Sequence, residues 1–462
     1  MASAARGILV SGWISGFWSS ERFRTGFSEP AAKPGLIPIF PMNPRIVENQ
    51  RRNVLTLIDA MARRMPPGRP FIPELRSALA ANQGFGARDR RLYRELIFTW
   101  LRFREWFDRA REIDPQLAIN LLVALSSDAP EVLPLQAALA VPGGIPLRSW
   151  SSLREALALL APGVPFELRE LLPAWFERHC PELFREEEVL TQLHRPPFWV
   201  RAQRGSGPEL VQELSRVAIA ATASTLIPGA VRIHAHTDLE KHPIIESGRA
   251  EIQDIGSQAL LAMTAPAAGQ HWLDLCAGAG GKTLQLAFSL GPSGRVTAHD
   301  IRREALVELR RRCIRAGLQN IIVEPVLPEP GPTQWQGVLV DAPCSSSGTW
   351  RRHPFLRHQT TPKTIRDYAH AQLPLLRRGA SYVAAGGRLV YATCSLSRQE
   401  NEDIVGALLK EEPEFVLERP PYIPEGVTVA PSGCVTLLPS ALDSDGYFLA
   451  CLRRQTASSH PR

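Results

Sequence analysis

Apolar side chains in the first third of the chain recur at the spacing of an α-helix. Leu92, Leu96 and Ile97 illustrate the pattern, because residues three and four positions apart share one helix face. The same texture predicts an all-α N-terminal domain over residues 42–160 and a helical linker over residues 161–195.

At Pro196 the pattern changes to shorter segments. Phe198–Ala202 and Ala230–His236 read as strands, because apolar, β-branched and aromatic residues dominate them, whereas Glu209–Ala218 reads as a helix. These segments predict a small α+β module over residues 196–265.

Beyond Gly269 the chain alternates between strand and helix patterns. Such alternation predicts a mostly parallel, doubly wound sheet, and the fold class is therefore α/β. We expect a Rossmann-like domain over residues 266–454 and a short tail over residues 455–462. The predicted strands are Trp272–Cys276, Val296–Asp300, Ile321–Val326, Val338–Asp341, Arg388–Thr393 and a final edge strand, Tyr447–Leu452. The predicted helices are Lys282–Leu290, Arg303–Ala316, Pro362–Ala385 and Gln399–Glu411.

Charge adds a candidate partner. The 462 residues carry a formal net charge of +7, and most of the 53 basic residues are Arg. Arginine binds phosphate through two parallel hydrogen bonds and stacks on bases, so nucleic acid is a reasonable partner. An arginine-rich codon usage would give the same bias. Five arginines of one helical segment therefore fit a solvated helix face and a phosphate-contacting helix equally well. They are Arg90, Arg91, Arg94, Arg102 and Arg104.

Cysteine usage and the chain ends restrict the class of protein. Seven scattered cysteines without a Cys-x-x-Cys pair argue against a disulfide framework and against a zinc site. Free thiols suit a reducing compartment, so we expect a cytoplasmic protein without a bound metal. The sequence contains no run of 18 apolar residues, so we predict no membrane span. For residues 1–41 we expect a disordered tail or a start assigned too early, with Met42 as a plausible first residue.

A glycine-rich turn follows the first predicted strand of the α/β domain. Asp274–Thr283 would let the backbone approach a ligand, and the helix after it offers free amide groups. Asp300 ends the next strand, where an acid typically accepts hydrogen bonds from ribose hydroxyls. The turn fits neither the dinucleotide fingerprint nor a P-loop. Together the turn and Asp300 indicate an adenosine-type ligand.

Two cysteines lie about 50 residues apart, each just after a predicted strand. Cys344 stands in Asp341–Cys344, and Cys394 follows Ala392-Thr393. Buried free cysteines are usually small hydrophobic residues, but the carboxyl ends of parallel strands are where catalytic groups gather. A thiolate that adds to carbon 6 of cytosine would activate carbon 5 for methylation, and a carboxylate such as Asp341 could stabilise the adduct. Spacing alone does not decide which thiol attacks.

These motifs resemble those of the Sun/nucleolar-protein family, which are S-adenosylmethionine-dependent RNA cytosine-5 methyltransferases. The resemblance extends over about residues 196–454. The helical part, around Gly86–Arg90, is more loosely similar to the antitermination-factor-like RNA-binding domain of the bacterial small-subunit ribosomal RNA members. The matching segments are Gln253–Gln258, Leu273–Thr283, Asp341–Ser345, Arg351–Pro354, Tyr391–Ser395 and Asn401–Glu402.

The resemblance implies a cofactor, S-adenosyl-L-methionine, and a role for each motif residue. Cys394 would be the nucleophile on carbon 6, Cys344 would assist product release, and Asp341 would face the methyl group and the target base. Asp300 would hold the ribose. The methionine and ribose part would be lined by Cys276, Ala277, Gly278, Ala279, Gly280, Gly281 and Lys282. RNA contact or ordering of the active-site loop would fall to Lys282, Arg352 and His353.

The substrate implied is RNA, most plausibly 16S ribosomal RNA, bound by a monomer; transfer RNA is the alternative. The sequence departs from the family at two points. Gly278-Ala279 replaces an Ala-Pro pair, and no Asp follows the third strand, where only Glu324 and Glu329 are available. The second departure leaves room for a non-catalytic assembly factor. An amino-directed methyltransferase would not need Cys394.

Overall fold

The computed structural model describes residues 42–456 with short internal gaps. The expectations for residues 1–41, for most of the C-terminal tail and for His236 fall outside the described residues. The gaps are 67, 127–129, 143, 144, 146, 148, 235–238 and 332–334.

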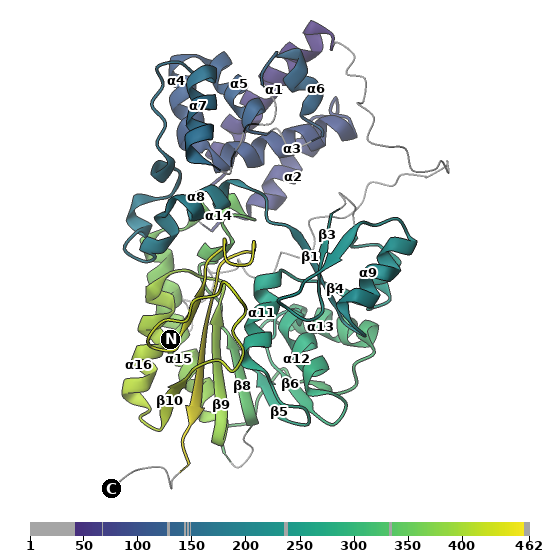
Figure 1. Ribbon diagram of the computed structural model, residues 1–462, viewed down its shortest axis with the longest axis vertical. Helices are drawn as coiled ribbons and strands as arrows, with labels where there is room; N and C mark the ends of the chain where they lie inside the picture. Colours follow the sequence, from purple (N-terminus) through teal and green to yellow (C-terminus); the bar gives the residue numbers. More distant parts are fainter. Residues whose placement is uncertain are drawn as a thin grey trace.

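Seven helices form the N-terminal domain within the described residues, as the helical spacing predicted (Figure 1). Side chains fix several starts: Asn43 accepts a hydrogen bond at the first helix, and Asp114 does so at the fifth. Their apolar faces meet in one buried core. The helices are α1 Pro44–Arg63, α2 Phe71–Ala81, α3 Ala87–Arg102, α4 Arg104–Ile113, α5 Pro115–Leu125, α6 Leu133–Ala138 and α7 Trp150–Leu160.

The linker is less helical than predicted. Three 3₁₀ turns, Leu168–Leu171, Ala174–Phe176 and Pro181–Phe184, precede a single α-helix, α8 Glu186–Leu193. Proline is the physical reason, because Pro173 and Pro181 lack the amide hydrogen that an α-helix interior requires.

The α+β module is a four-stranded antiparallel sheet with strand order β2-β3-β1-β4. Its elements are β1 Phe198–Ala202, α9 Gly207–Arg216, β2 Ala221–Ala223, β3 Ala230–Ile233, α10 Pro243–Glu246 and β4 Ala250–Ile252. Helix α11, Ile255–Thr264, leads from this module into the large domain.

The large domain is the predicted Rossmann-like sheet, with strand order β10-β12-β9-β8-β5-β6-β7 and β11 paired to β12. Strands β9, β8, β5, β6 and β7 run parallel. The strands are β5 His271–Asp274, β6 Arg295–Ala298, β7 Ile321–Val323, β8 Trp335–Asp341, β9 Val383–Thr393, β10 Phe415–Glu418, β11 Val435–Leu437 and β12 Tyr447–Arg454. The helices are α12 Gly281–Leu290, α13 Arg303–Ala316, α14 Pro354–Gln359, α15 Pro362–Ser381 and α16 Glu402–Glu411.

Two expectations about this sheet are wrong. Strand β12 is an inner strand, because β10 pairs with its outer side in antiparallel register. Helix α15 ends at Ser381 rather than Ala385, since Val383 already pairs with Trp335 of β8. Tertiary pairing thus overrides helix propensity at this junction.

The helical domain and the sheet share one core. Phe71 of α2 stacks on Phe355 of α14 with ring centroids 4.8 Å apart. Trp350, Phe355 and Leu356 of the large domain are buried in the same apolar cluster as helices α1 to α5. Figure 1 shows α14 and α8 lying between the N-terminal helices and the sheet. Within the described residues every helix is too short or too polar to span a bilayer.

Candidate active site

The two predicted cysteines meet at the carboxyl ends of adjacent parallel strands. Cys344 follows β8 and Cys394 follows β9, and their Sγ atoms are 3.4 Å apart. Because β8 and β9 are in register up to Asp341 and Ala392, the residues just beyond them are forced together. The sequence predicted this meeting.

The two thiols differ in exposure and in hydrogen bonding. Cys394 is partly exposed, its Sγ donates to the Ser346 hydroxyl at 3.5 Å, and it lies near both the Asp341 carboxylate and the Lys282 ammonium. The hydrogen bond from Cys344 is the main cause that lowers the pKa of Cys394. Cys344 is only 4% exposed. Its hydrogen bond to Cys394, its burial and the Glu400 carboxylate raise the pKa of Cys344. The pair is therefore polarised towards a Cys394 thiolate and a Cys344 thiol.

Lys282 and Asp341 form an ion pair beside the sulfurs. The Lys282 Nζ donates to Asp341 Oδ2 at 2.8 Å. Burial alone would lower the pKa of Lys282, but the Asp341 carboxylate raises it, so the side chain stays cationic. Tyr447 places its ring centroid 6.0 Å from the same Nζ. The prediction that Lys282 and Asp341 border the reacting groups agrees with this placement, while their contacts with RNA and cofactor stay predictions.

A buried carboxylate that the sequence analysis missed joins the two cysteine loops. Glu400 is fully buried and bonds to the residues after both cysteines. It accepts from the Ser345 amide at 2.7 Å, from the Ser345 hydroxyl at 2.5 Å and from the Ser395 hydroxyl at 2.6 Å. Gln372 adds a bond at 3.3 Å. The bonds to Ser345 and Ser395 fix the spacing of the sulfurs, because each of these serines directly follows one of the cysteines.

The loop after Cys344 runs closely against Cys394. The Gly348 amide donates to the Cys394 carbonyl at 2.9 Å, and the Gly446 amide donates to the Gly348 carbonyl at 2.7 Å. A Cβ at Gly348 would lie 2.1 Å from the Gly446 oxygen, so a larger residue cannot fit without backbone movement.

Arg352 and His353 lie on the inner side of this loop. Arg352 donates to Asp254 and to Asp445, both at 2.6 Å, which ties the loop to α11 and to the segment before β12. His353 is neutral at pH 7, because burial lowers its pKa to about 4. Of the two roles that the resemblance implied, loop ordering matches the contacts of Arg352; RNA contact stays a prediction for both residues.

The glycine-rich turn forms a tight cradle after β5. Gly278 and Gly280 have positive φ angles of 54° and 93°, and a Cβ at Gly280 would lie 2.2 Å from Leu309. The Gly278 amide donates to Asp300 Oδ2 at 2.8 Å, so the turn and the predicted ribose acid do meet. Arg302 also binds that carboxylate. Burial alone would raise the pKa of Asp300, but the bonds from Arg302 lower it.

The remaining turn residues differ in exposure and in their contacts. Cys276 is partly exposed, and burial raises its pKa well above the ordinary value, so it stays a thiol. Ala277 is buried, and Arg312 binds the Ala279 carbonyl at 2.9 Å. Gly281 begins α12, which points its free amides at the cradle.

Asp274, just before the turn, carries an orphaned oxygen. The residue is 1% exposed, Thr283 donates to Oδ2 at 2.7 Å, and Oδ1 has no hydrogen-bond partner among the described residues. Burial raises the pKa of Asp274 to about 7. An acceptor left open beside a glycine cradle fits a ligand that brings an ammonium group, as the methionine part of S-adenosylmethionine does.

The acid after the third strand has no clear substitute. Glu324 is held by its backbone, whose carbonyl accepts from His299 at 2.9 Å, and Glu329 is exposed. Two apolar side chains stand open at the same edge: Ile301 is 87% exposed and Val326 is 73% exposed. Their place after β6 and β7 suits the face of a purine rather than its polar edge.

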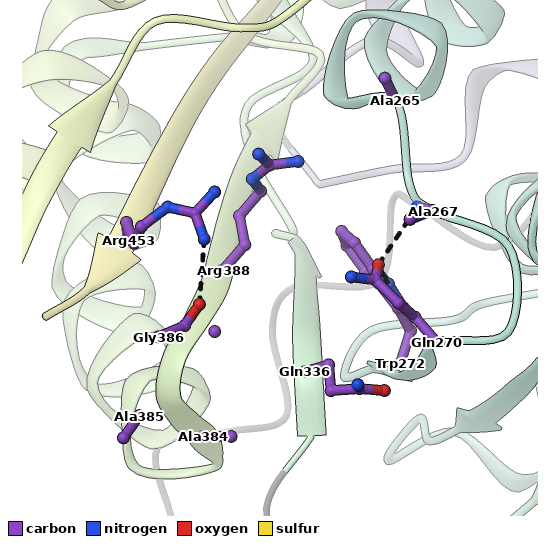
Figure 2. Close-up of a pocket in the computed structure, with 11 residues that line it drawn as sticks. Ala265, Ala267, Gln270, Trp272, Gln336, Ala384, Ala385, Gly386, Arg388 and Arg453 are labelled. Atoms are coloured by element: carbon purple, nitrogen blue, oxygen red, sulfur yellow. Dashed lines mark hydrogen bonds between the residues drawn. The ribbon is translucent and has the colours of Figure 1, made fainter. Parts of the chain in front are cut away.

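A cavity of about 320 Å³ lies at the opposite, amino end of the strands (Figure 2). Arg388 donates to Glu418 and to the Thr264 carbonyl, and Arg453 donates to Glu418 and to the Gly386 carbonyl. Both guanidinium groups of the cavity thus have hydrogen-bond partners within the protein, and they share one carboxylate, Glu418. No cluster of three or more potential metal ligands occurs among the described residues.

Comparisons with known proteins point to one family. The model of the 16S rRNA methyltransferase RsmB/F family matches residues 261–453. The chain is 30% identical over 312 residues to the Ribosomal RNA small subunit methyltransferase B of Citrobacter koseri, covering 65% of this chain and 70% of that protein. The protein of the same name from Sodalis glossinidius is 29% identical over 314 residues, covering 66% and 70%.

Solved structures share the fold. The crystal structure of PH0851 superposes with a TM-score of 0.63 at 21% identity, covering 87% of this chain and 98% of that one. NSun6 from Pyrococcus horikoshii, solved with SFG, gives a TM-score of 0.53 at 19% identity, covering 63% of this chain and 98% of that one.

Proposed function

Because the chain belongs to the 16S rRNA methyltransferase RsmB/F family, we propose that it methylates carbon 5 of a cytosine through the Cys394 sulfur. It is an S-adenosylmethionine-dependent RNA methyltransferase. The observation that carries the assignment of the nucleophile is the pair of sulfurs 3.4 Å apart, of which Cys394 is partly exposed and Cys344 is buried. The hydrogen bonds with Cys344 and Ser346 favour the anion at Cys394, whereas the bond to Cys394, burial and Glu400 disfavour one at Cys344.

The proposed reaction begins with addition of the Cys394 thiolate to carbon 6 of the cytosine. A carbon–sulfur bond forms, and the electron pair of the ring double bond moves to carbon 5. Carbon 5 would bond to the methyl group that the cofactor's sulfonium supplies, while the methyl–sulfur bond breaks and its electron pair stays on the sulfur as a neutral thioether. Asp341, held by Lys282, would accept a hydrogen bond from the exocyclic amine of the base and so stabilise the adduct.

The second half of the reaction releases the product. A base must remove the hydrogen of carbon 5, the electrons return to the ring, and the bond to Cys394 breaks. Cys344, 3.4 Å from that sulfur, is placed to assist this step. The target base has to leave its stack to reach the two loops. We place this reaction in the cytoplasm, on 16S ribosomal RNA, with the protein acting as a monomer.

The cofactor would lie in the glycine-rich cradle. Asp274 would hold its ammonium group, Asp300 its ribose, and Gly278 and Gly280 would allow the close approach of the backbone. The exposed side chains of Ile301 and Val326 would contact the adenine faces in place of a hydrogen-bonding Asp.

Methyl transfer from labelled S-adenosylmethionine to small-subunit ribosomal RNA tests the proposal, with transfer RNA in parallel. The parent should label the ribosomal RNA, Cys394→Ala should label nothing, and Cys344→Ala should accumulate a protein–RNA adduct. A parent that binds RNA without binding the cofactor would favour the assembly factor. Labelling by Cys394→Ala would contradict the proposed nucleophile.

A further inference from the structure

Arg102 ends α3 where the helical domain meets the large domain, and the Nε of its buried side chain has no hydrogen-bond partner among the described residues. The residue is 6% exposed, and its Nε is sealed from solvent with no acceptor among the described residues. Burial lowers the pKa of Arg102 to about 10, so the guanidinium remains charged at neutral pH. A buried cation normally has a carboxylate beside it, because burial removes the water that stabilised its charge.

Around Arg102, positively charged side chains outnumber carboxylates. Three other arginines lie close enough to lower its pKa, and each already has a carboxylate of its own. Four guanidinium groups thus share three carboxylates, which leaves one positive charge uncompensated. The pairs are Arg195 with Glu95 at 3.0 Å, Arg351 with Asp443 at 2.6 Å and Arg357 with Glu105 at 3.8 Å.

The end of α3 offers only partial compensation. A helix C-terminus favours a cation near its free carbonyl groups. Arg357 takes the carbonyls of Leu101 and Arg102 at 2.7 and 3.0 Å, and His358 also contacts the Leu101 carbonyl. The backbone acceptors nearest to Arg102 are therefore already bonded.

Two other arginines of the same segment behave differently. Arg91 pairs with Glu131 at 3.6 Å, and Arg104 pairs with Asp108 at 3.4 Å and lies over the Trp100 ring. These two fit a solvated helix face. Arg102 does not fit a solvated helix face. For this residue the structure therefore argues against one of the two interpretations that the sequence left equal.

One loop connects this seam to the reacting sulfur. Ser346 contacts the Cys394 sulfur, and five residues later Arg351 reaches the seam, where it also binds the carbonyls of His194 and Arg195. Its neighbour Arg352 fixes the loop from the other side. An anion at Arg102 would therefore lie against the same structural unit that positions Cys394.

We propose that Arg102, together with the half-exposed side chain of Arg195, binds a backbone phosphate of the RNA strand whose base enters the active site. The inference rests on the proposed function. A phosphodiester supplies the missing negative charge and matches the fork of a guanidinium. Such a contact sets the position of the strand and carries no information about the base.

RNA affinity measured against salt concentration tests this site. Small-subunit ribosomal RNA is the probe, and Arg102→Met in the full chain is the main variant, since methionine fills the space without charge. We expect about tenfold weaker binding, and a slope of log affinity against log salt that is lower by about one. Arg104→Met, which removes a surface-paired arginine two residues away, should change neither value.

Thermal unfolding separates this role from a structural one. Arg102→Met should melt at or above the parent temperature, because it removes an uncompensated buried charge. Unchanged RNA affinity and salt slope in this variant would overturn the phosphate site. Arg102→Lys, which keeps the charge but loses the fork, should fall between parent and Arg102→Met. A parent that neither binds RNA nor transfers methyl would instead contradict the proposed function itself.

Discussion

The two ends of the parallel strands differ in how their polar groups are matched. At the amino end, a cavity holds Arg388 and Arg453, and Glu418 and backbone carbonyls accept hydrogen bonds from both. At the carboxyl end, Asp274 has an orphaned oxygen and the two thiols are polarised against each other. The difference shows that a cavity does not by itself mark the place where reactive groups lie. Ligand chemistry belongs where the protein leaves a group incompletely satisfied.

The largest expected effect removes the nucleophile. Cys394→Ala should reduce methyl transfer by about 10⁴-fold or more, because the neighbouring Cys344 sulfur is buried and its pKa is raised. Affinity for S-adenosylmethionine should stay within about twofold of the parent. Single-turnover transfer together with calorimetry measures both. A loss of cofactor affinity equal to the loss of rate would place Cys394 in the cofactor site instead.

Replacing the orphaned carboxylate should weaken cofactor binding. Asp274→Asn keeps the size and the Thr283 contact but cannot attract an ammonium group, so we expect about 10- to 100-fold weaker affinity at pH 8. In the parent, affinity should rise as pH increases through about 7, where Asp274 ionises. Calorimetry between pH 6 and 8 tests the trend, and the variant should lack it.

The same carboxyl group makes stability depend on pH. Its folded pKa of about 7 lies above the unfolded value near 3.8, so the folded state holds the proton more tightly. Its contribution is therefore fully present below about pH 4 and is lost as the pH rises through 7. Melting curves of Asp274→Asn should show a smaller decline over that interval than those of the parent.

Loosening the link between the cysteine loops should have an intermediate effect. Glu400→Gln keeps the shape but replaces an acceptor by an NH₂ group that faces the Ser345 amide. We expect kcat to fall about tenfold with KM nearly unchanged, because Glu400 lies behind the thiols rather than against the substrate. The loss of its negative charge should also lower the pKa of Cys344, which the pH dependence of thiol alkylation reports. Equal changes in kcat and KM without a thiol shift would indicate general unfolding.

The smallest effect is expected at the amino end. Arg453→Met should cost less than about 1 kcal/mol of unfolding free energy, since Glu418 keeps its bond to Arg388. Methyl transfer should equal that of the parent. A large loss of activity in this variant would show that the cavity of Figure 2 takes part in function, and the contrast between the two ends would fail.

The sequence predicted the helices and strands that have a repeating apolar pattern, and the candidate residues that directly follow a strand. Cys344 and Cys394 were placed together because each follows a strand of an alternating pattern, and neighbouring parallel strands end at one edge. Which thiol attacks depends on the hydrogen bond between the two sulfurs and on the burial of Cys344, which only the folded chain defines.

Other features had no local signal. Glu400 lies in a short 3₁₀ turn, where neither spacing nor neighbours mark a buried carboxylate. The inner position of β12 was missed because β10 is four residues long and pairs over a distance of more than thirty residues. Arg102 looked like its neighbours along α3, since the sequence does not show which of several arginines lacks a carboxylate.

The shared core of α2, α3 and α14 has a consequence for synthesis on the ribosome. The N-terminal helices emerge first, yet Trp350, Phe355 and Leu356, which complete their apolar cluster, are translated only after the α+β module and four strands of the sheet. Until then the helical domain exposes the surface that α14 will cover, including the ring of Phe71. The nascent chain must therefore keep an unfinished interface from aggregating for much of its translation, and a chaperone that binds aromatic surface has its target there.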